Sequence, residues 1–374
     1  METLRSHIIS LFIILTCLLI SCSENSPTQI EGSLTEQLQQ ALDDGVAFCD
    51  GKGVSAAVII LGHQIWLGTS GISHETTPLT SNMLLGIGSI TKTFIAGLTL
   101  KLVEDAVFSL DDPISNWLPA YPNIDGAITI RQLLNHTSGV FNTSENATIY
   151  NRVFEDLTKI WTPEEMITEF VSAPYFEAGT DHHYANTNYI LLGMIIEAAT
   201  GTGISDVLRN RILEPLNLNH TFMFLEEELI GVTAHPWWDY DFNDTVDDLT
   251  SLSWNGDYSS TWTAGCMFST AEDLAEWYNA LLYEKTILNQ SSLNQMLDYF
   301  PADEFEYGLG IRTFPSMISG VQIIGHTGTL WGYSGILIHL PEYGVSISVL
   351  LNKREGDCRE AIAEALTQTV LDNL

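Results

Sequence analysis

A serine and a lysine three positions apart, Ser89 and Lys92, are the residues whose types and spacing most clearly suggest chemistry. They open an apolar stretch that we expect to be helical from Ser89 to about Ala106, and residues three apart share one face of a helix. Serine is a weak nucleophile that needs a neighbouring base, and a lysine serves where burial makes its neutral form accessible. A helix start at Ser89 also directs free N–H groups towards a developing oxyanion. The alternative is an ordinary helix start, because serine is a common N-cap.

Two later stretches carry further polar residues. Tyr184 and Asn186 stand in a loop just before a second apolar helix. A third group opens the late strand patterns and consists of His326, Thr327, Gly328 and Thr329. Taken alone, the tyrosine suits a half-buried core position and the histidine a satisfied loop position. Only their occurrence together with the serine and lysine indicates a site.

The charge balance excludes one class of partner. The chain has 14 Lys and Arg residues against 47 Asp and Glu, a formal net charge of −33. Nucleic acid is bound through a basic footprint, so we expect no nucleic-acid partner. Hydrophobic residues make up 45% of the chain, enough for a sizeable core. No feature indicates an oligomeric state.

The N-terminus has the pattern of a targeting segment. A basic start at Arg5 is followed by the apolar run Ile8–Ile20, which is short for a membrane span. Small residues before Cys22 are similar to a bacterial lipoprotein signal, in which that cysteine is acylated and several acyl chains anchor the protein. We expect a signal peptide over 1–21, a tether over 22–32 and an extracytoplasmic position in the bacterial cell envelope. The alternative is a secretory signal without lipid, cleaved nearby.

The hydrophobic patterns predict the elements around these residues. A helix over 34–48, headed by a capping box at Ser33–Glu36, comes first. A buried strand over Val54–Leu61 then turns back into Ile65–Gly68. Helical patterns follow at 129–135, 163–172, 188–200, 203–213 and 271–283. The late strand patterns are Gly308–Phe314, Val321–Ile324, Ser334–Leu340 and Val345–Asn352, with a last helix after them.

This order predicts an α/β (α+β) fold. An antiparallel sheet is built from both ends of the chain and flanked by helices, and a mostly helical domain is inserted between its strands. We expect one unit over 33–374. Its sheet subdomain comprises 33–108 and 302–374, and its helical subdomain comprises 109–301.

Three motifs in this order resemble those of the serine β-lactamase and penicillin-binding protein family. They are Ser-x-x-Lys, Tyr-x-Asn and His/Lys-x-Gly, and the likeness is greatest to the class C β-lactamase and D-alanyl-D-alanine carboxypeptidase branch. Leu133–Gly139 and Ala264–Leu274 look like further signatures. The resemblance covers about residues 35–370 and implies the same fold.

The resemblance implies catalytic roles for four residues. Ser89 would be the acylated nucleophile and Lys92 would assist its deprotonation. Tyr184 would share general acid–base work, its phenol made more acidic by a nearby ammonium charge. Asn186 would hydrogen-bond the substrate amide. No cofactor is implied, and no metal site either, because Asp181–His183 lacks a partner cluster.

The resemblance also implies how a substrate would be held. His326, Thr327 and Gly328 would line an edge strand along which the substrate lies extended, and Gly328 leaves room for it. The N–H groups of Ser89 and Thr329 would form the oxyanion hole.

One residue departs from the β-lactamase pattern. His326 stands where typical β-lactamases have lysine, and a neutral histidine is a poorer anchor for a carboxylate. The segment His235–Trp262 is rich in Asp, Trp and Tyr and has no Lys or Arg. If it overhangs the site, we expect it to disfavour anionic substrates and to offer aromatic surface; the alternative is a solvated loop.

In the fold that the sequence resembles, the first and last helices cover the same sheet face. Cys49 ends the first helix and Cys358 begins the last, so a disulfide between them is one expectation. Two buried free thiols are the other.

These inferences predict a lipid-anchored serine hydrolase that acts through an acyl-enzyme on an amide or ester. A D-Ala-D-Ala carboxypeptidase or D-amino-acid peptidase leads, followed by a carboxylesterase and then a β-lactamase of the same family. The alternative from another class is a penicillin-binding sensor that acylates once without turnover.

Overall fold

The computed structural model describes the chain from Thr28 to Leu374 except residues 30–31, 50, 62–63 and 355. The expected signal peptide, Cys22 and most of the expected tether lie outside the described residues. Two residues of that tether, Thr28–Gln29 (β1), pair with the sheet.

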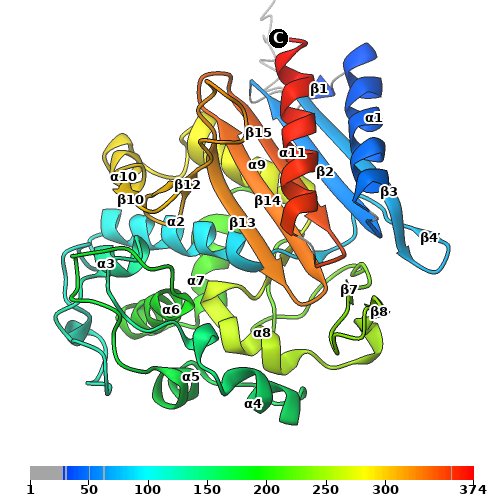
Figure 1. The fold of residues 1–374 in the computed structure, drawn as a ribbon. Helices are drawn as coiled ribbons and strands as arrows, with labels where there is room; N and C mark the ends of the chain where they lie inside the picture. The colour runs from blue at the N-terminus through cyan, green and yellow to red at the C-terminus, as the bar shows by residue number, and fades with distance from the viewer. Residues whose placement is uncertain (1–27, 30–31, 50, 62–63, 355) are drawn as a thin grey trace, which may run out of the picture.

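The main sheet is antiparallel apart from β1 and is built from both ends of the chain (Figure 1). Its strand order is β1-β3-β2-β15-β14-β13-β12-β11-β10. The bounds are Gly53–Ile60 (β2), Gln64–His74 (β3), Phe300–Pro301 (β10), Glu306–Tyr307 (β11), Arg312–Thr313 (β12), Ile324–Leu330 (β13), Tyr333–Leu340 (β14) and Val345–Leu351 (β15). A short strand, Thr77–Pro78 (β4), pairs with β3.

Helices cover both faces of this sheet. The helices α1 (Ser33–Phe48) and α11 (Gly356–Leu371) lie side by side on one face (Figure 1). On the other face lie α9 (Ala271–Tyr278) and the helical part of the molecule. Val58 of β2 packs with α1 and α11, whereas its neighbour Ile59 packs with the opposite core. Both faces are therefore apolar, which is why β2 and β15 are continuous buried runs.

The helical part is built around two buried helices, α2 (Thr91–Glu104) and α6 (Asn186–Thr200). Both are apolar nearly all round because each is enclosed by other elements. The surrounding helices are Ile130–Leu134 (α3), Ile149–Glu155 (α4), Pro163–Phe170 (α5), Ile204–Leu208 (α7), Asn255–Thr261 (α8) and Gln290–Met296 (α10). Small sheets join Leu85–Gly86 (β5), Met267–Ser269 (β9) and Phe222–Met223 (β6), and Trp237–Trp238 (β7) with Asp247–Asp248 (β8).

Four local predictions are corrected. Gly32 rather than Ser33 is the N-cap of α1, without a side-chain cap, so the predicted capping box is wrong. Ser89 lies in the turn η1 (Gly88–Ile90), and the α-helix begins only at Thr91. Asn186 is the first residue of α6 rather than a loop residue.

The fourth correction concerns the late strands. The pattern Gly308–Phe314 is broken into the hairpin β11–β12, because the Gly308 N–H donates to the Ile311 carbonyl and Gly310 adopts a positive φ. Val321–Ile324 is not a strand of its own. Instead β13 begins at Ile324 and contains the whole third motif.

Among the described residues, no single helix has the length and apolar composition of a membrane span. One bent pair, Asn186–Thr200 with Ile204–Leu213, meets those criteria together.

Cys49 and Cys358 form a disulfide, the first of the two outcomes that the sequence analysis left open. Their Cα atoms are 5.5 Å apart and 309 positions separate them in the chain. The bond joins the C-terminal end of α1 to the first turn of α11. Cys266 is a buried free thiol.

We expect Cys49→Ala to lower the free energy of unfolding by about 2–4 kcal/mol, because the bond closes a long loop in the unfolded chain. Denaturant unfolding of the wild type and the variant measures it. Reductant should destabilise the wild type and leave the variant unchanged; equal stability of the two proteins under oxidising conditions contradicts the prediction.

Candidate active site

The turn that carries Ser89 packs directly against strand β13. A Cβ atom at Gly88 would lie 2.5 Å from the Thr329 backbone nitrogen, and one at Gly328 would collide with the Ile87 carbonyl oxygen. Gly88 also has a φ of 52°. Only glycine permits so close an approach of two backbones. The Ser89 and Thr329 backbone nitrogens are thereby placed on facing segments, an arrangement that suits an oxyanion hole.

The amine of Lys92 is fully buried among three oxygen atoms. Its Nζ lies 2.9 Å from Ser89 Oγ, 2.8 Å from Asn186 Oδ1 and 2.7 Å from the carbonyl oxygen of Ala264. The side chain is 0% exposed. Burial lowers the pKa of Lys92 well below its usual value, because a buried ammonium loses its hydration.

These three partners suit a neutral amine. The oxygens of Asn186 and Ala264 can only accept, and they match the two N–H groups that a neutral lysine keeps. Ser89 has a proton of its own and can donate it to the nitrogen lone pair. The arrangement is that of a base hydrogen-bonded to its nucleophile.

The side chain of Asn186 holds the lysine in place. Its Oδ1 accepts from Lys92 while its Nδ2 donates to Ser144 Oγ at 2.8 Å. Its backbone N–H donates to Asn142 Oδ1 at 3.1 Å. The Nδ2 group has a second hydrogen, which could donate to the carbonyl oxygen of a substrate amide. Binding of a substrate amide by Asn186 stays a prediction. The sequence analysis missed Asn142 and Ser144, because small polar loop residues carry no spacing signal.

Tyr184 faces the same centre, with a pKa shift opposite to the expected one. Nζ of Lys92 lies 4.8 Å from the centre of the Tyr184 ring. Burial raises the pKa of Tyr184, and the smaller effects of Ser89 and of the Arg312 charge do not offset it. The expected acidic phenol is therefore wrong: burial outweighs the nearby charges. At neutral pH Tyr184 is therefore a phenol that can give a proton, whereas Lys92 has the lowered pKa that a base requires.

His136, from the stretch Leu133–Gly139, fixes the second motif from behind. Its Nδ1 accepts the Ala185 N–H at 3.2 Å, between the two motif residues. Its ring lies 4.3 Å from the ring of Tyr184, centre to centre. Its role is thus to position Tyr184.

His326 is buried, which favours the neutral form that the sequence analysis assumed. Its Nδ1 lies 2.6 Å from the Thr327 carbonyl oxygen and its Nε2 lies 2.9 Å from Tyr307 Oη. A carbonyl can only accept, so Nδ1 carries the proton and Nε2 accepts from Tyr307. Burial and the charges of Lys92 and Arg312 lower the pKa of His326 well below its usual value. It cannot anchor a carboxylate by charge.

A cation that the sequence analysis did not identify lines the same cavity. Arg312, on β12, lines a space of about 270 Å³ together with Ser89, Tyr184, Phe305, Tyr307, His326, Thr327 and Thr329. Its Nη2 lies 3.4 Å from Thr327 Oγ1 and 3.7 Å from Glu360, and its Nε is buried without a partner among the described residues. The expected bias against anions therefore does not extend to this cavity.

Beside the motif residues, β13 is an edge strand, because β12 pairs only with Ile324 and Gly325. Arg359 of α11 supports it from below, donating to the Gly328 carbonyl at 2.7 Å and to Thr329 Oγ1 at 2.6 Å. Arg359, which directly follows the disulfide-bonded Cys358, thus contacts β13.

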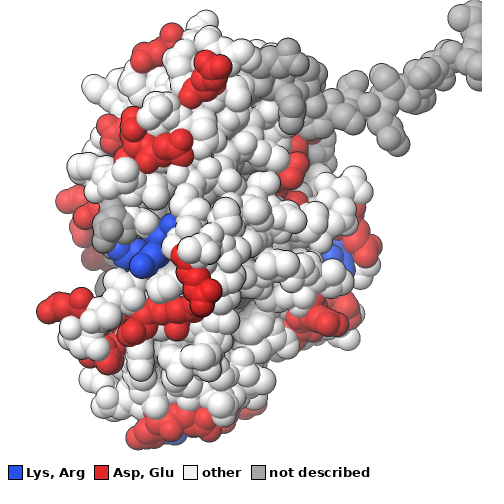
Figure 2. Space-filling model, turned by 90° about the vertical axis from the view of Figure 1, so that its right-hand side faces the viewer, with Lys and Arg blue, Asp and Glu red and all other residues white. Residues whose placement is uncertain are grey.

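The acidic, aromatic segment His235–Trp262 reaches the site through its aromatic rings. Trp238 packs on Trp331, with ring centres 5.1 Å apart, and Trp254 meets the same ring at 5.0 Å. Its carboxylates Asp241 and Asp244 are exposed. Figure 2 shows Asp and Glu side chains spread widely over one face of the molecule, with basic side chains in small groups only.

Within the described part of the chain, no group of three or more His, Cys, Asp or Glu side chains is arranged to hold a metal ion. His183 instead contacts Glu145 at 3.2 Å.

Comparison with known proteins agrees with this geometry. The family model described as beta-lactamase matches residues 38–370. Penicillin-binding protein 4* of Bacillus subtilis is 27% identical over 310 residues; the match covers 78% of this chain and 66% of that protein, just under two thirds of its length. A D-stereospecific amidohydrolase from Streptomyces sp. superposes with a TM-score of 0.76 at 32% identity, covering 88% of this chain and 97% of the other. A D-amino acid amidase from Ochrobactrum anthropi SV3, complexed with L-phenylalanine amide, has a TM-score of 0.80 at 29% identity, with 91% and 99% covered.

Replacing Lys92 with methionine should slow acylation of Ser89 by at least about 100-fold, because it removes the base and keeps the volume. The rate of labelling by a fluorophosphonate measures this. Lys101→Met, on the partly exposed side of the same helix, is the matched control and should label at the wild-type rate. A Lys92→Met protein that folds and labels like the wild type refutes the assignment.

Proposed function

The chain belongs to the beta-lactamase family, and we propose that it is a serine hydrolase that forms an acyl-enzyme at Ser89 on amides of D-amino acids. The observation that carries this proposal is the buried Lys92 amine, 2.9 Å from Ser89 Oγ, with its two other partners able only to accept. A nucleophile paired with a neutral base is the requirement for acyl transfer.

The steps of the proposed reaction use these residues in turn. Lys92 takes the Ser89 proton as Oγ bonds to the substrate carbonyl carbon, and the N–H groups of Ser89 and Thr329 bind the oxyanion. Tyr184 gives its proton to the leaving nitrogen as the C–N bond breaks, and it regains one from the Lys92 ammonium. Water then attacks the carbonyl carbon of the ester while Lys92 takes a proton from it, and the resulting ammonium returns that proton to Ser89 Oγ as the ester C–O bond breaks.

Two observations support D-amino-acid substrates. Two structural neighbours at 29–32% identity are named for D-stereospecific amide hydrolysis. In addition, Arg312 offers a cation beside Tyr184, where the leaving group receives its proton. A leaving D-amino acid with a free carboxylate suits this position, which favours a peptidase over a carboxylesterase. A sensor without turnover would lack the deacylation step.

We also propose that the protein is anchored outside the cytoplasm by lipid on Cys22. The support is the apolar run that ends in small residues before this cysteine. Metabolic labelling with a fatty acid probe should mark the wild type and not Cys22→Ser; labelling of both contradicts it.

We expect wild-type protein to release product from D-phenylalanine amide faster than from the L-amide, with a transient covalent adduct at Ser89. Ser89→Ala should lose both the adduct and the activity, because Ser89 has the one hydroxyl among the three hydrogen-bond partners described for the Lys92 amine. Mass spectrometry and product release measure this, with the exposed Ser115→Ala as control. An adduct on Ser89→Ala, or equal rates for the two enantiomers, contradicts the proposal.

Replacing Arg312 with glutamine should lower kcat/KM for a D-dipeptide about tenfold more than for the corresponding D-amide, because only the dipeptide has a carboxylate for the cation to bind. Arg131→Gln, a partly exposed arginine on α3, is the matched control. An equal loss for both substrates indicates a structural effect and contradicts the role.

A further inference from the structure

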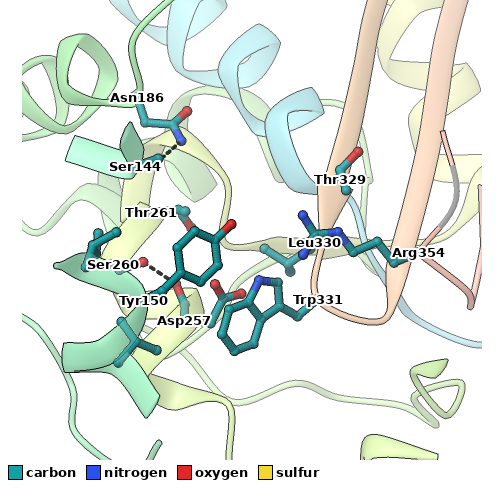
Figure 3. Close-up of a pocket in the computed structure, with 12 residues that line it drawn as sticks. Ser144, Tyr150, Asn186, Asp257, Ser260, Thr261, Thr329, Leu330, Trp331 and Arg354 are labelled. Atoms are coloured by element: carbon teal, nitrogen blue, oxygen red, sulfur yellow. Dashed lines mark hydrogen bonds between the residues drawn. The ribbon is translucent and has the colours of Figure 1, made fainter. Parts of the chain in front are cut away.

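A second cavity adjoins the catalytic centre, and Tyr184 is not among the residues that line it. It holds about 180 Å³ and shares Thr329 with the first cavity and Asn186 with the catalytic network (Figure 3). Its other lining residues are Ser144, Ile149, Tyr150, Val153, Asp257, Ser260, Thr261, Leu330, Trp331 and Arg354. The volume suits a single amino-acid residue rather than a peptide.

Two charged side chains in this cavity each have one buried atom without a hydrogen-bond partner among the described residues. Asp257, in the first turn of α8, has a buried Oδ2 without a hydrogen-bond partner among the described residues. Arg354, which follows β15, has a buried Nη1 that also lacks a hydrogen-bond partner among the described residues. Its guanidinium stacks on Trp238 at 4.4 Å. A buried carboxylate oxygen without a hydrogen bond is costly, so Asp257 Oδ2 is suited to a ligand group that donates.

The position of Tyr184, the proposed proton donor to the leaving group, decides which part of a substrate enters this cavity. Tyr184 gives the proton to the leaving nitrogen, and Tyr184 and Arg312 line the first cavity. The leaving group therefore occupies the first cavity. The acyl residue, on the other side of the reacting carbonyl, must extend past Asn186 and Thr329 into the second.

We infer that Asp257 binds the free α-ammonium group of the acyl residue, so that the enzyme removes single D-residues from unblocked N-termini or hydrolyses their amides. This inference rests on the proposed function and narrows it. A carboxypeptidase would instead place a blocked peptide nitrogen here, which has no charge to offer Asp257.

The walls of the cavity agree with this occupant. Trp331 and Tyr150 stack, with ring centres 6.1 Å apart, and Figure 3 shows both rings beside the Asp257 carboxylate. Aromatic faces favour a cation or an apolar side chain. Burial raises the pKa of Asp257, and the charge of Arg354, which lies over the Trp238 ring, offsets part of that rise.

The ionisation of Asp257 adds a pH signature. Burial raises its pKa to about 7, against the opposing effects of Arg354 and the Trp331 N–H. The titratable groups around it are Arg354 and Tyr150 on the cavity wall, Tyr258 on its own helix and Lys92 beyond Asn186. Lys92 serves every substrate, so it cancels in a ratio of two. The preference for a free amine should fall as pH drops below about 7, where Asp257 is protonated, and again above about 8, where an α-amine loses its charge.

The test compares D-phenylalanine p-nitroanilide with its N-acetyl derivative. Wild-type kcat/KM should favour the free amine by about 10- to 100-fold, mainly through KM, since a hydrogen bond to a charged group is of this strength. Asp257→Asn should reduce that ratio by a similar factor and abolish its decline at low pH. Asp244→Asn removes the same charge from an exposed position with φ of 65°, which asparagine tolerates, and should keep the wild-type ratio.

The outcomes separate the two proposals. A wild type that prefers the blocked substrate, or an Asp257→Asn ratio equal to that of the wild type, overturns the role of Asp257 and leaves D-amide hydrolysis standing. A wild type that cleaves neither substrate overturns both. The wild-type comparison needs no variant, so the inference can be tested even if Asp257→Asn fails to fold.

Discussion

The hydrogen bonds of the buried Lys92 amine are the interaction on which the rest of the site depends. A primary amine without hydration favours its neutral form, and here its two acceptors come from distant parts of the chain, at Asn186 and Ala264. Both are held by larger structures: Asn186 by the loop that carries Asn142 and Ser144, and Ala264 by the turn before β9. The helical part of the fold therefore holds the Lys92 amine in place beside Ser89.

The sheet supplies the other half of the site. Strand β13 reaches the Ser89 turn only because glycine stands at both points of contact, Gly88 and Gly328. Behind it, Arg359 of α11 bonds to the Gly328 carbonyl and to Thr329, and the neighbouring disulfide ties this end of α11 to α1. The position of the Ser89 and Thr329 N–H groups thus depends on packing on the far face of the sheet.

Local pattern was sufficient to predict much of this and insufficient for the rest. The continuous apolar runs indicated β2 and β15, and the order of elements indicated the sheet built from both ends of the chain. The three motifs placed Ser89, Lys92 and Asn186 correctly as neighbours, because their spacing is specific. Arg312 could not be found in this way, and Asp257 was noted only as one carboxylate of the acidic segment His235–Trp262: the fold alone decides which charged residue faces a cavity. The predicted direction of the Tyr184 pKa shift was wrong, because burial raises this pKa and outweighs the nearby charge. Burial is a property of the tertiary structure that the local sequence does not give.

The protonation state of Lys92 in the free protein is the most direct test of this account. Selective ¹³C and ¹⁵N labelling of lysine, with NMR titration of the Cε and Nζ resonances, separates Lys92 from the exposed lysines; loss of one resonance in Lys92→Met identifies it. The account predicts that Lys92 titrates well below the others and is neutral at the pH where acylation is fast. A Lys92 that stays protonated through that range, while Ser89 still acylates, contradicts it.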